Sequence, residues 1–162
     1  MIDYPALLRA LHDHGVRFII VDGAAATAHG AARLTQDLDV VYERSRENLG
    51  HLVAALSPHQ PYLRGAPPGL PFQFDVETLR NGLNFTLTSK LGDVDLLGEI
   101  VGGGGYGALE PHAVEIELFG VRFIIVGGAA ATAHGSARLT QDLDIVYERS
   151  RENLGHLVAA IR

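Results

Sequence analysis

Two aspartate pairs with the same spacing stand out among the residues that could do chemistry. Asp37 and Asp39, and again Asp142 and Asp144, lie two positions apart within segments rich in valine, leucine and isoleucine. On a β-strand such side chains point to the same face, roughly 7 Å apart at the backbone. Their like charges repel unless a cation lies between them, and hard cations such as Mg²⁺ prefer oxygen ligands. The alternative interpretation is that the two aspartates cap turns at the end of a strand.

A glycine pair precedes the second of these acidic pairs. Gly127 and Gly128 lead from an apolar run into an alanine-rich stretch, and Asp142 follows 14 residues after the second glycine. Glycines at the start of a helix let backbone N–H groups approach an anion closely. Taken alone, a glycine pair between a strand and a helix more often reflects close packing of these elements than anion binding. Together with the two carboxylates, it indicates a site for a phosphate and a metal ion.

The chain contains one long segment twice. Residues 15–56 return as residues 120–161, and only four of the 42 aligned positions differ: Asp22/Gly127, Ala31/Ser136, Val40/Ile145 and Leu56/Ile161. The residues just before the two copies are unrelated, so the repeat begins abruptly. An old solenoid repeat would have diverged and would have a shorter period. Near-identity with a sharp edge indicates a recent recombination or a laboratory joining of segments, of which we favour the second.

Hydrophobic periodicity predicts the elements that position the aspartates. Leu7, Leu8 and Leu11 predict a short amphipathic helix with Asp3 as its cap and Pro5 in its first turn. The other expected elements of the first copy are a buried strand at Val16–Val21, an alanine-rich helix at Gly23–His29 that Gly30 ends, and a strand at Asp37–Tyr42. A helix that Ser45 caps should follow, because Leu49, Leu52, Val53 and Leu56 fall at positions i, i+3, i+4 and i+7. The second copy should repeat these elements.

The middle of the chain, residues 57–119, occurs once. Its expected elements are an irregular, proline-rich loop at Ser57–Pro71, a short helix at Asp75–Arg80, paired strands at Leu83–Ser89 and Asp93–Leu97 that turn at Lys90–Gly92, a flexible loop at Gly102–Gly105 and a strand at Ala113–Leu118. We expect residues 1–162 to form one domain, because the chain is too short for two.

Composition narrows the class of protein. Apolar residues make up 47% of the chain and charged residues 20%, which is typical of a globular protein. The formal charge of −6 argues against a bare nucleic-acid-binding surface, although metal ions can still join carboxylates to phosphates. The absence of cysteine excludes disulfides and thiolate zinc sites. The N-terminus lacks the pattern of a signal peptide, and the longest apolar stretch, Phe123–Ala133, is about half a membrane span, so we expect a cytoplasmic protein without a membrane partner.

The motifs of the second copy resemble the signature of the nucleotidyltransferase superfamily. The residues that carry this resemblance are Val126-Gly127-Gly128, Ala133-His134-Gly135, Arg138, Thr140 and Asp142-Leu143-Asp144-Ile145. The nearest branch is the minimal and abortive-infection-type bacterial nucleotidyltransferases, many of them toxin–antitoxin components. The resemblance covers both copies and most of the middle. It implies an α/β fold with a small mixed β-sheet and flanking helices, with the N-terminal segment duplicated at the C-terminus.

The resemblance also implies a reaction and a set of site residues. The glycines, Gly127 and Gly128 with Gly23 in the first copy, would hold a nucleoside triphosphate, expected to be ATP. The aspartate pairs would bind two Mg²⁺ ions, and a third carboxylate on a neighbouring strand would complete the site.

Asp95 is our candidate for this third carboxylate, and Asp93, on the same face, is the runner-up. Arg138 and Thr140 could position phosphate, although a solvated arginine and a turn threonine explain them equally well. The implied reaction transfers a nucleoside monophosphate to a hydroxyl group of a protein, an RNA end or a small molecule.

Two departures from the family pattern bear on activity. Asp22 replaces the first glycine in the first copy, and a carboxylate about 5 Å from a phosphate charge costs roughly 3 kcal/mol at an effective dielectric of 20. We therefore expect the second copy to bind triphosphate better than the first. In addition, the second copy replaces the C-terminal helices that usually help to hold the nucleotide.

Two functions therefore remain open: an active enzyme, and a catalytically silent nucleotidyltransferase-fold protein whose duplication makes an assembly. The single middle can complete either the first copy in normal order or the second in circularly permuted order. The copy left over should find a partner in another chain, which predicts a homodimer by segment exchange.

Overall fold

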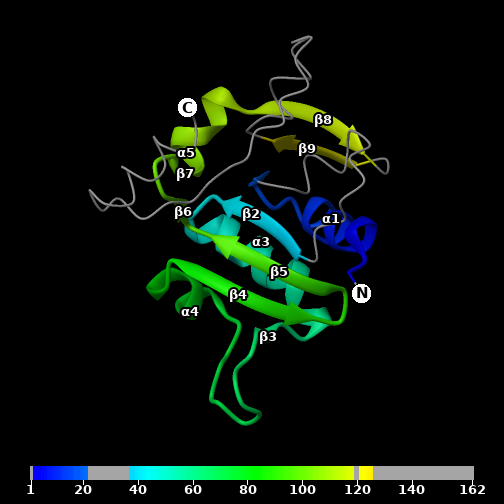
Figure 1. Ribbon diagram of the computed structural model, residues 1–162, viewed down its shortest axis with the longest axis vertical. Helices are drawn as coiled ribbons and strands as arrows, with labels where there is room; N and C mark the ends of the chain where they lie inside the picture. Colours follow the sequence, from blue (N-terminus) through cyan, green and yellow to red (C-terminus); the bar gives the residue numbers. More distant parts are fainter. Residues whose placement is uncertain (1, 22–36, 119–120, 126–162) are drawn as a thin grey trace, which may run out of the picture.

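A mixed β-sheet with helices packed against it forms the centre of the molecule (Figure 1). The computed structural model describes residues 2–21, 37–118 and 121–125. The helices are α1 (Tyr4–Asp13), α3 (Arg46–Leu56), α4 (Val76–Asn81) and α5 (Tyr106–Leu109), with 3-10 turns at Ser57–His59 and Glu110–His112. The strands are β1 (Phe18–Ile20), β2 (Asp37–Tyr42), β3 (Tyr62–Leu63), β4 (Asn84–Ser89), β5 (Gly92–Leu97), β6 (Glu99–Ile100), β7 (Gly104–Gly105), β8 (Val114–Leu118) and β9 (Val121–Ile125). Across these described residues, no helix is long and apolar enough to cross a membrane.

The order of the strands shows how the first copy and the middle combine. Within the described residues, seven strands form one sheet in the order β3-β4-β5-β2-β1-β9-β8, and β6 pairs with β7 separately. β2 is antiparallel to β1 and parallel to β5, and β5 is antiparallel to β4. The first copy therefore supplies β1 and β2, and the middle completes them in normal chain order. The fold is α/β with a mixed sheet, as predicted.

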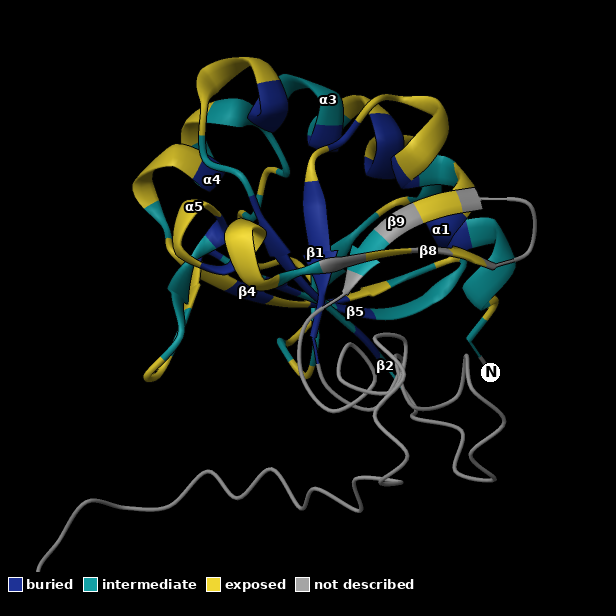
Figure 2. Cartoon of the chain, turned by 90° about the horizontal axis from the view of Figure 1, so that it is seen from above, coloured by how far each residue is buried: buried dark blue, intermediate teal, exposed yellow. Residues whose placement is uncertain are grey.

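One face of the sheet packs against three helices. Leu38, Val40 and Tyr42 of β2 and Val94 and Leu96 of β5 belong to one buried cluster. α1, α3 and α4 lie on this side of the sheet (Figure 2). Their buried leucines are Leu7, Leu8, Leu11, Leu49, Leu52, Leu56 and Leu79. Because side chains alternate along a strand, the aspartates of β2 and β5 lie on the opposite face.

A smaller apolar cluster covers part of the opposite face. Ile19 and Val21 of the first copy and Val41 of β2 pack there against Tyr106 and Leu109 of α5. This cluster lies toward the carboxyl end of β2. The amino-terminal half of β2, which carries the aspartates, lies beyond it.

The three longer helices begin at the caps that their sequences indicate. The carboxylate of Asp3 accepts a hydrogen bond from the backbone N–H of Ala6 at 3.0 Å, with Pro5 in the first turn of α1. Ser45 caps α3 in the same way, and Asp75 caps α4. A side-chain oxygen at this position satisfies one of the N–H groups that a helix start leaves without a partner. The predictions for α1, α3 and α4 are confirmed.

The strand predictions are confirmed for β1, β2, β4, β5 and β8, but two loop predictions are wrong. The segment Ser57–Pro71 contains a 3-10 turn and β3, because Leu63 packs against the core and Tyr62 and Leu63 pair with β4. The segment Gly102–Gly105 contains β7, which pairs with β6 through backbone hydrogen bonds that need no side chains. The predicted helix at Gly23–His29 lies outside the described residues. Of the second copy, the structure describes the strand β9.

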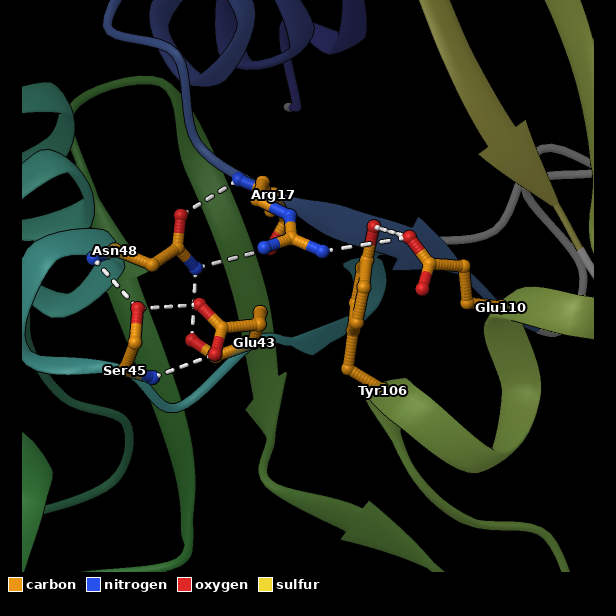
Figure 3. Close-up of polar contacts among 6 residues, drawn as sticks. All are labelled: Arg17, Glu43, Ser45, Asn48, Tyr106 and Glu110. Carbon is orange, nitrogen blue, oxygen red and sulfur yellow. Dashed lines mark hydrogen bonds and ion pairs between the residues drawn. The ribbon is translucent and has the colours of Figure 1, made fainter.

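A buried asparagine ties α3 to the two strands of the first copy (Figure 3). Asn48 is 2% exposed, and its amide oxygen accepts from the backbone N–H of Arg17 at 2.7 Å. Its amide nitrogen donates to the backbone oxygens of Arg17 at 3.0 Å and Glu43 at 2.7 Å. Arg17 in turn stacks on the ring of Tyr106, 5.1 Å from its centroid, and contacts Glu110. One side chain therefore fixes the angle between α3 and the β1–β2 pair.

Replacing Asn48 with alanine should lower the free energy of unfolding by about 1–3 kcal/mol, since it removes three partly buried hydrogen bonds to the backbone of Arg17 and Glu43. Urea denaturation followed by circular dichroism measures the change. The matched control is Asn81→Ala at the exposed end of α4, which should change the stability by less than about 0.5 kcal/mol. Equal stability of Asn48→Ala and wild type would contradict the role given to Asn48.

Candidate metal centre

The parallel pairing of β2 and β5 brings four aspartates together. In this register Asp37 lies beside Asp93, and Asp39 lies beside Asp95. All four occupy alternate positions, so they share the face that the helices α1, α3 and α4 leave open. Each strand contributes two charges to one patch, while its intervening residues are buried in the core.

Three of these aspartates are close enough to share a metal ion. Asp37, Asp39 and Asp95 each offer one carboxylate oxygen, and these oxygens lie within 4.8 Å of one another. The three residues, which we call the acidic triad, are each partly buried. This arrangement favours Asp95 over Asp93 as the third carboxylate. Only oxygen ligands are present in the triad, which suits Mg²⁺ and does not suit softer metals.

A tight turn sets the position of the carboxylates on β5. Ser89 pairs with Gly92 across the turn, and Gly92 has a φ of 119°, a conformation that residues with a side chain rarely adopt. A β-carbon on Gly92 would also come within 2.6 Å of the backbone of Ile2. The backbone N–H of Asp3 donates to the oxygen of Leu91 at 2.7 Å, so the start of α1 is fastened to the same turn.

Arg64 inserts its guanidinium group among the aspartates. It donates to Asp37 at 3.1 Å and to Asp93 at 3.3 Å, and it makes a further short contact with Asp95. Arg64 follows directly after β3, in the segment that the sequence predicts to be an irregular loop. Sequence reasoning missed it because nothing local to residues 57–71 indicates that β3 would pair with β4 and place this side chain beside β5.

Burial raises the pKa of Asp95 above the usual range of an aspartate. The charge of Arg64 and a hydrogen bond from Thr86 act in the opposite direction, and the charges of Asp37 and Asp93 add to the rise. The carboxylate form of Asp95 is therefore less stable in the folded protein than in water. A cation beside it would remove part of this penalty, because an opposite charge favours the ionised form.

Several predicted site residues lie outside the described residues. They are Gly23 of the first copy, and Gly127, Gly128, Arg138, Thr140, Asp142 and Asp144 of the second. The structure brings together Asp37, Asp39 and Asp95 from the predicted set. The expectation that the second copy binds triphosphate better than the first depends on Gly127 and Gly128, and it stays a prediction.

No protein-family model and no curated protein matches the sequence. Among solved structures, the chain is similar to the crystal structure of a candidate nucleotidyltransferase from Thermotoga maritima. The match has a TM-score of 0.50 and 14% sequence identity, and it covers 99% of this chain and 91% of the other. Similarity at this level of identity establishes the fold: the chain has a nucleotidyltransferase-like fold.

The raised pKa of Asp95 predicts a gain of stability when this residue loses its charge. In the presence of EDTA at neutral pH, Asp95→Asn should raise the melting temperature, because it removes a carboxylate that folding disfavours. The folded protein binds the proton of Asp95 more tightly than the unfolded chain does. The wild type therefore loses stability as pH rises through the raised pKa, and the advantage of the variant should vanish in acid.

The control for this measurement is Asp75→Asn. A hydrogen bond from the backbone of Thr78 lowers the pKa of Asp75, so the loss of its charge should not stabilise the protein. Thermal melts from acidic to neutral pH compare the two variants. A melting temperature of Asp95→Asn below that of wild type at neutral pH would contradict the interpretation.

Proposed function

We propose that the protein is an Mg²⁺-dependent nucleotidyltransferase that transfers a nucleoside monophosphate from a nucleoside triphosphate to a hydroxyl group. One observation carries the proposal: two parallel neighbouring strands of a nucleotidyltransferase-like fold place Asp37, Asp39 and Asp95 within ligand distance of one another. A neighbouring aspartate, Asp93, adds a fourth charge to the same face.

The charge of the site supports binding of divalent cations. The four aspartates contribute four negative charges, and Arg64 contributes one positive charge, so these five side chains together carry a net charge of −3. One or two divalent ions would bring this patch close to neutrality. When bound, such ions would activate the attacking hydroxyl and stabilise the charge that develops on the phosphate oxygens.

The side chains of the triad have separate tasks in this proposal. Asp37 and Asp39, at the amino-terminal end of β2, would hold the ions, which would supply positive charge for the phosphates. Asp95 would accept the proton of the acceptor hydroxyl on a carboxylate oxygen. The acceptor oxygen then bonds to the α-phosphorus, the bond to the bridging oxygen breaks, and pyrophosphate leaves.

The finer assignments follow from the resemblance of the motifs. We propose ATP as the nucleotide, and a protein, an RNA end or a small hydroxyl compound as the acceptor. An abortive-infection or toxin–antitoxin role in the cytoplasm belongs to the same proposal. The glycine pair of the second copy, Gly127 and Gly128, is the proposed site for the triphosphate.

Asparagine substitutions in the triad should abolish metal binding and any nucleotide transfer. Asp37→Asn/Asp39→Asn and Asp95→Asn each remove ligand charge without changing the size of the side chain, so titration with Mn²⁺ by calorimetry should show no binding. Asp142→Asn/Asp144→Asn should leave binding to the described triad intact. The same titrations with Mg²⁺-ATP test the sequence-based expectation that this second double variant loses more nucleotide binding than the first.

Asp13→Asn is the matched control, since Asp13 is exposed at the end of α1 and lies outside the acidic patch. If Asp95→Asn binds Mn²⁺ as tightly as wild type does, Asp93 is the third carboxylate instead of Asp95. Failure of the wild type to bind Mn²⁺ would end the proposed function.

A second candidate function, a catalytically silent protein whose duplicated segment builds an assembly, is favoured by one observation. β1 and β9 come from equivalent positions of the two copies, and they pair in parallel with Ile19 beside Ile124 and Ile20 beside Ile125. Strand β9 of the second copy therefore extends the sheet beside β1 of the first copy, and it does not take the place of β1.

If the leftover copy engages another chain, light scattering at micromolar concentration should give the mass of a dimer. Deletion of residues 126–162, which keeps β8 and β9, should then restore a monomer. A monodisperse monomer of the full chain would remove the segment-exchanged homodimer and leave the enzyme proposal untouched.

A further inference from the structure

Arg64 occupies the acidic patch that the proposed function assigns to metal ions. Its guanidinium group contacts Asp37 and Asp95, which are two members of the triad, and also Asp93. A guanidinium group offers several donors in one plane, and this geometry suits contact with more than one carboxylate at once. The side chain of Arg64 is 28% exposed, so these ion pairs are shielded from water for the most part.

Hydrogen bonds hold the backbone of Arg64, whereas its side chain is held by its contacts with the aspartates. The N–H of Arg64 donates to the oxygen of Thr86 at 3.0 Å, and Thr86 pairs with Asp95. On the other side, the hydroxyl of Tyr62 donates to the oxygen of Pro67 at 2.8 Å and accepts from the N–H of Leu70 at 3.0 Å. These bonds close the base of the loop after β3 (Figure 1). Removal of Arg64 from the patch therefore requires rotation of its side chain alone.

A guanidinium group and a divalent cation cannot both be close to the same carboxylates without cost. Asp37 and Asp95, which both contact Arg64, belong to the three residues that would hold the ion, and like charges repel at such short range. The ion must therefore displace Arg64 or bind beside it with reduced affinity. In either case the two cations compete.

We propose that Arg64 is a built-in competitor of the divalent cation: it holds the acidic patch together in the cation-free protein and leaves the triad when the ion binds. The proposal rests on the proposed function, because it takes the triad to be a metal site. It assigns to Arg64 the role of setting the cation concentration at which the site fills. A cation-free site held by Arg64 keeps its carboxylates in place, whereas the same site without Arg64 would lose the positive charge that contacts Asp37, Asp93 and Asp95.

Arg64→Gln tests the competition. Calorimetric titration of the EDTA-treated and dialysed full chain with Mn²⁺ should give a dissociation constant about tenfold or more below that of wild type. Without the ion, Arg64→Gln should melt at a lower temperature than wild type, because the charges of the aspartates then lack their counter-ion. The rise in melting temperature on addition of Mn²⁺ should be larger for the variant than for wild type.

Arg80→Gln is the matched control. It changes the net charge by the same amount, but Arg80 is paired with Glu77 on α4 and lies outside the acidic patch. Its Mn²⁺ affinity should equal that of wild type. Arg64→Lys keeps the positive charge but lacks the planar guanidinium group, so its Mn²⁺ affinity should lie between those of wild type and Arg64→Gln. If Arg64→Gln does not fold, the Mn²⁺ affinity of Arg64→Lys tests the competition instead.

If Arg64→Gln folds but binds Mn²⁺ no more tightly than wild type does, the proposal is overturned. Arg64 would then only position the carboxylates. If Arg64→Lys alone folds, an affinity no tighter than wild type has the same consequence. These outcomes leave the proposed function standing, because the wild type still binds the ion. If wild type and every Arg64 variant fail to bind Mn²⁺, the proposed function and this inference fail together.

Discussion

The parallel pairing of β2 with β5 is the constraint on which the rest of the site depends. The register puts Asp37 beside Asp93 and Asp39 beside Asp95, so four like charges lie on adjacent strands and on one face. Neither strand can shift by one residue to relieve this repulsion, because such a shift would move Leu38, Val40, Val94 and Leu96 out of the core. The hydrophobic pattern that stabilises one face thus fixes an unfavourable arrangement of charge on the other.

The remaining structure can be understood as a response to that arrangement. Among the described residues, α1, α3 and α4 cover the apolar face and α5 covers part of the other, and the acidic end of β2 lies outside the area that these helices cover. Arg64 supplies one compensating charge from the position directly after β3, and two strands, β4 and β5, lie between β3 and β2 in the sheet. Because Asp95 keeps a raised pKa despite Arg64, this compensation is incomplete.

The sequence predicted those features that depend on local pattern. Alternation placed Asp37 and Asp39 on one face, the caps at Asp3 and Ser45 marked two helices, and the resemblance directed attention to Asp95. It did not predict β3 or Arg64, because a two-residue strand among prolines has no periodicity and gains its stability from contacts with β4. The β6–β7 pair was not predicted for a similar reason, since backbone pairing by itself produces no pattern of hydrophobic side chains in the sequence. Non-local pairing was therefore the missing information in both cases.

The duplication limits how many complete triads one chain can form. The sequence contains the Asp-x-Asp pair of the repeat twice, but it contains Asp95 and its strand β5 once. Both edges of β5 are already paired, one with β4 and the other with β2 of the first copy. The second copy could pair with Asp95 only if the residues equivalent to β2 took its place beside β5, or if they paired with β5 of another chain. Each chain therefore holds one complete triad at most, and a second copy of the aspartate pair adds no second metal centre.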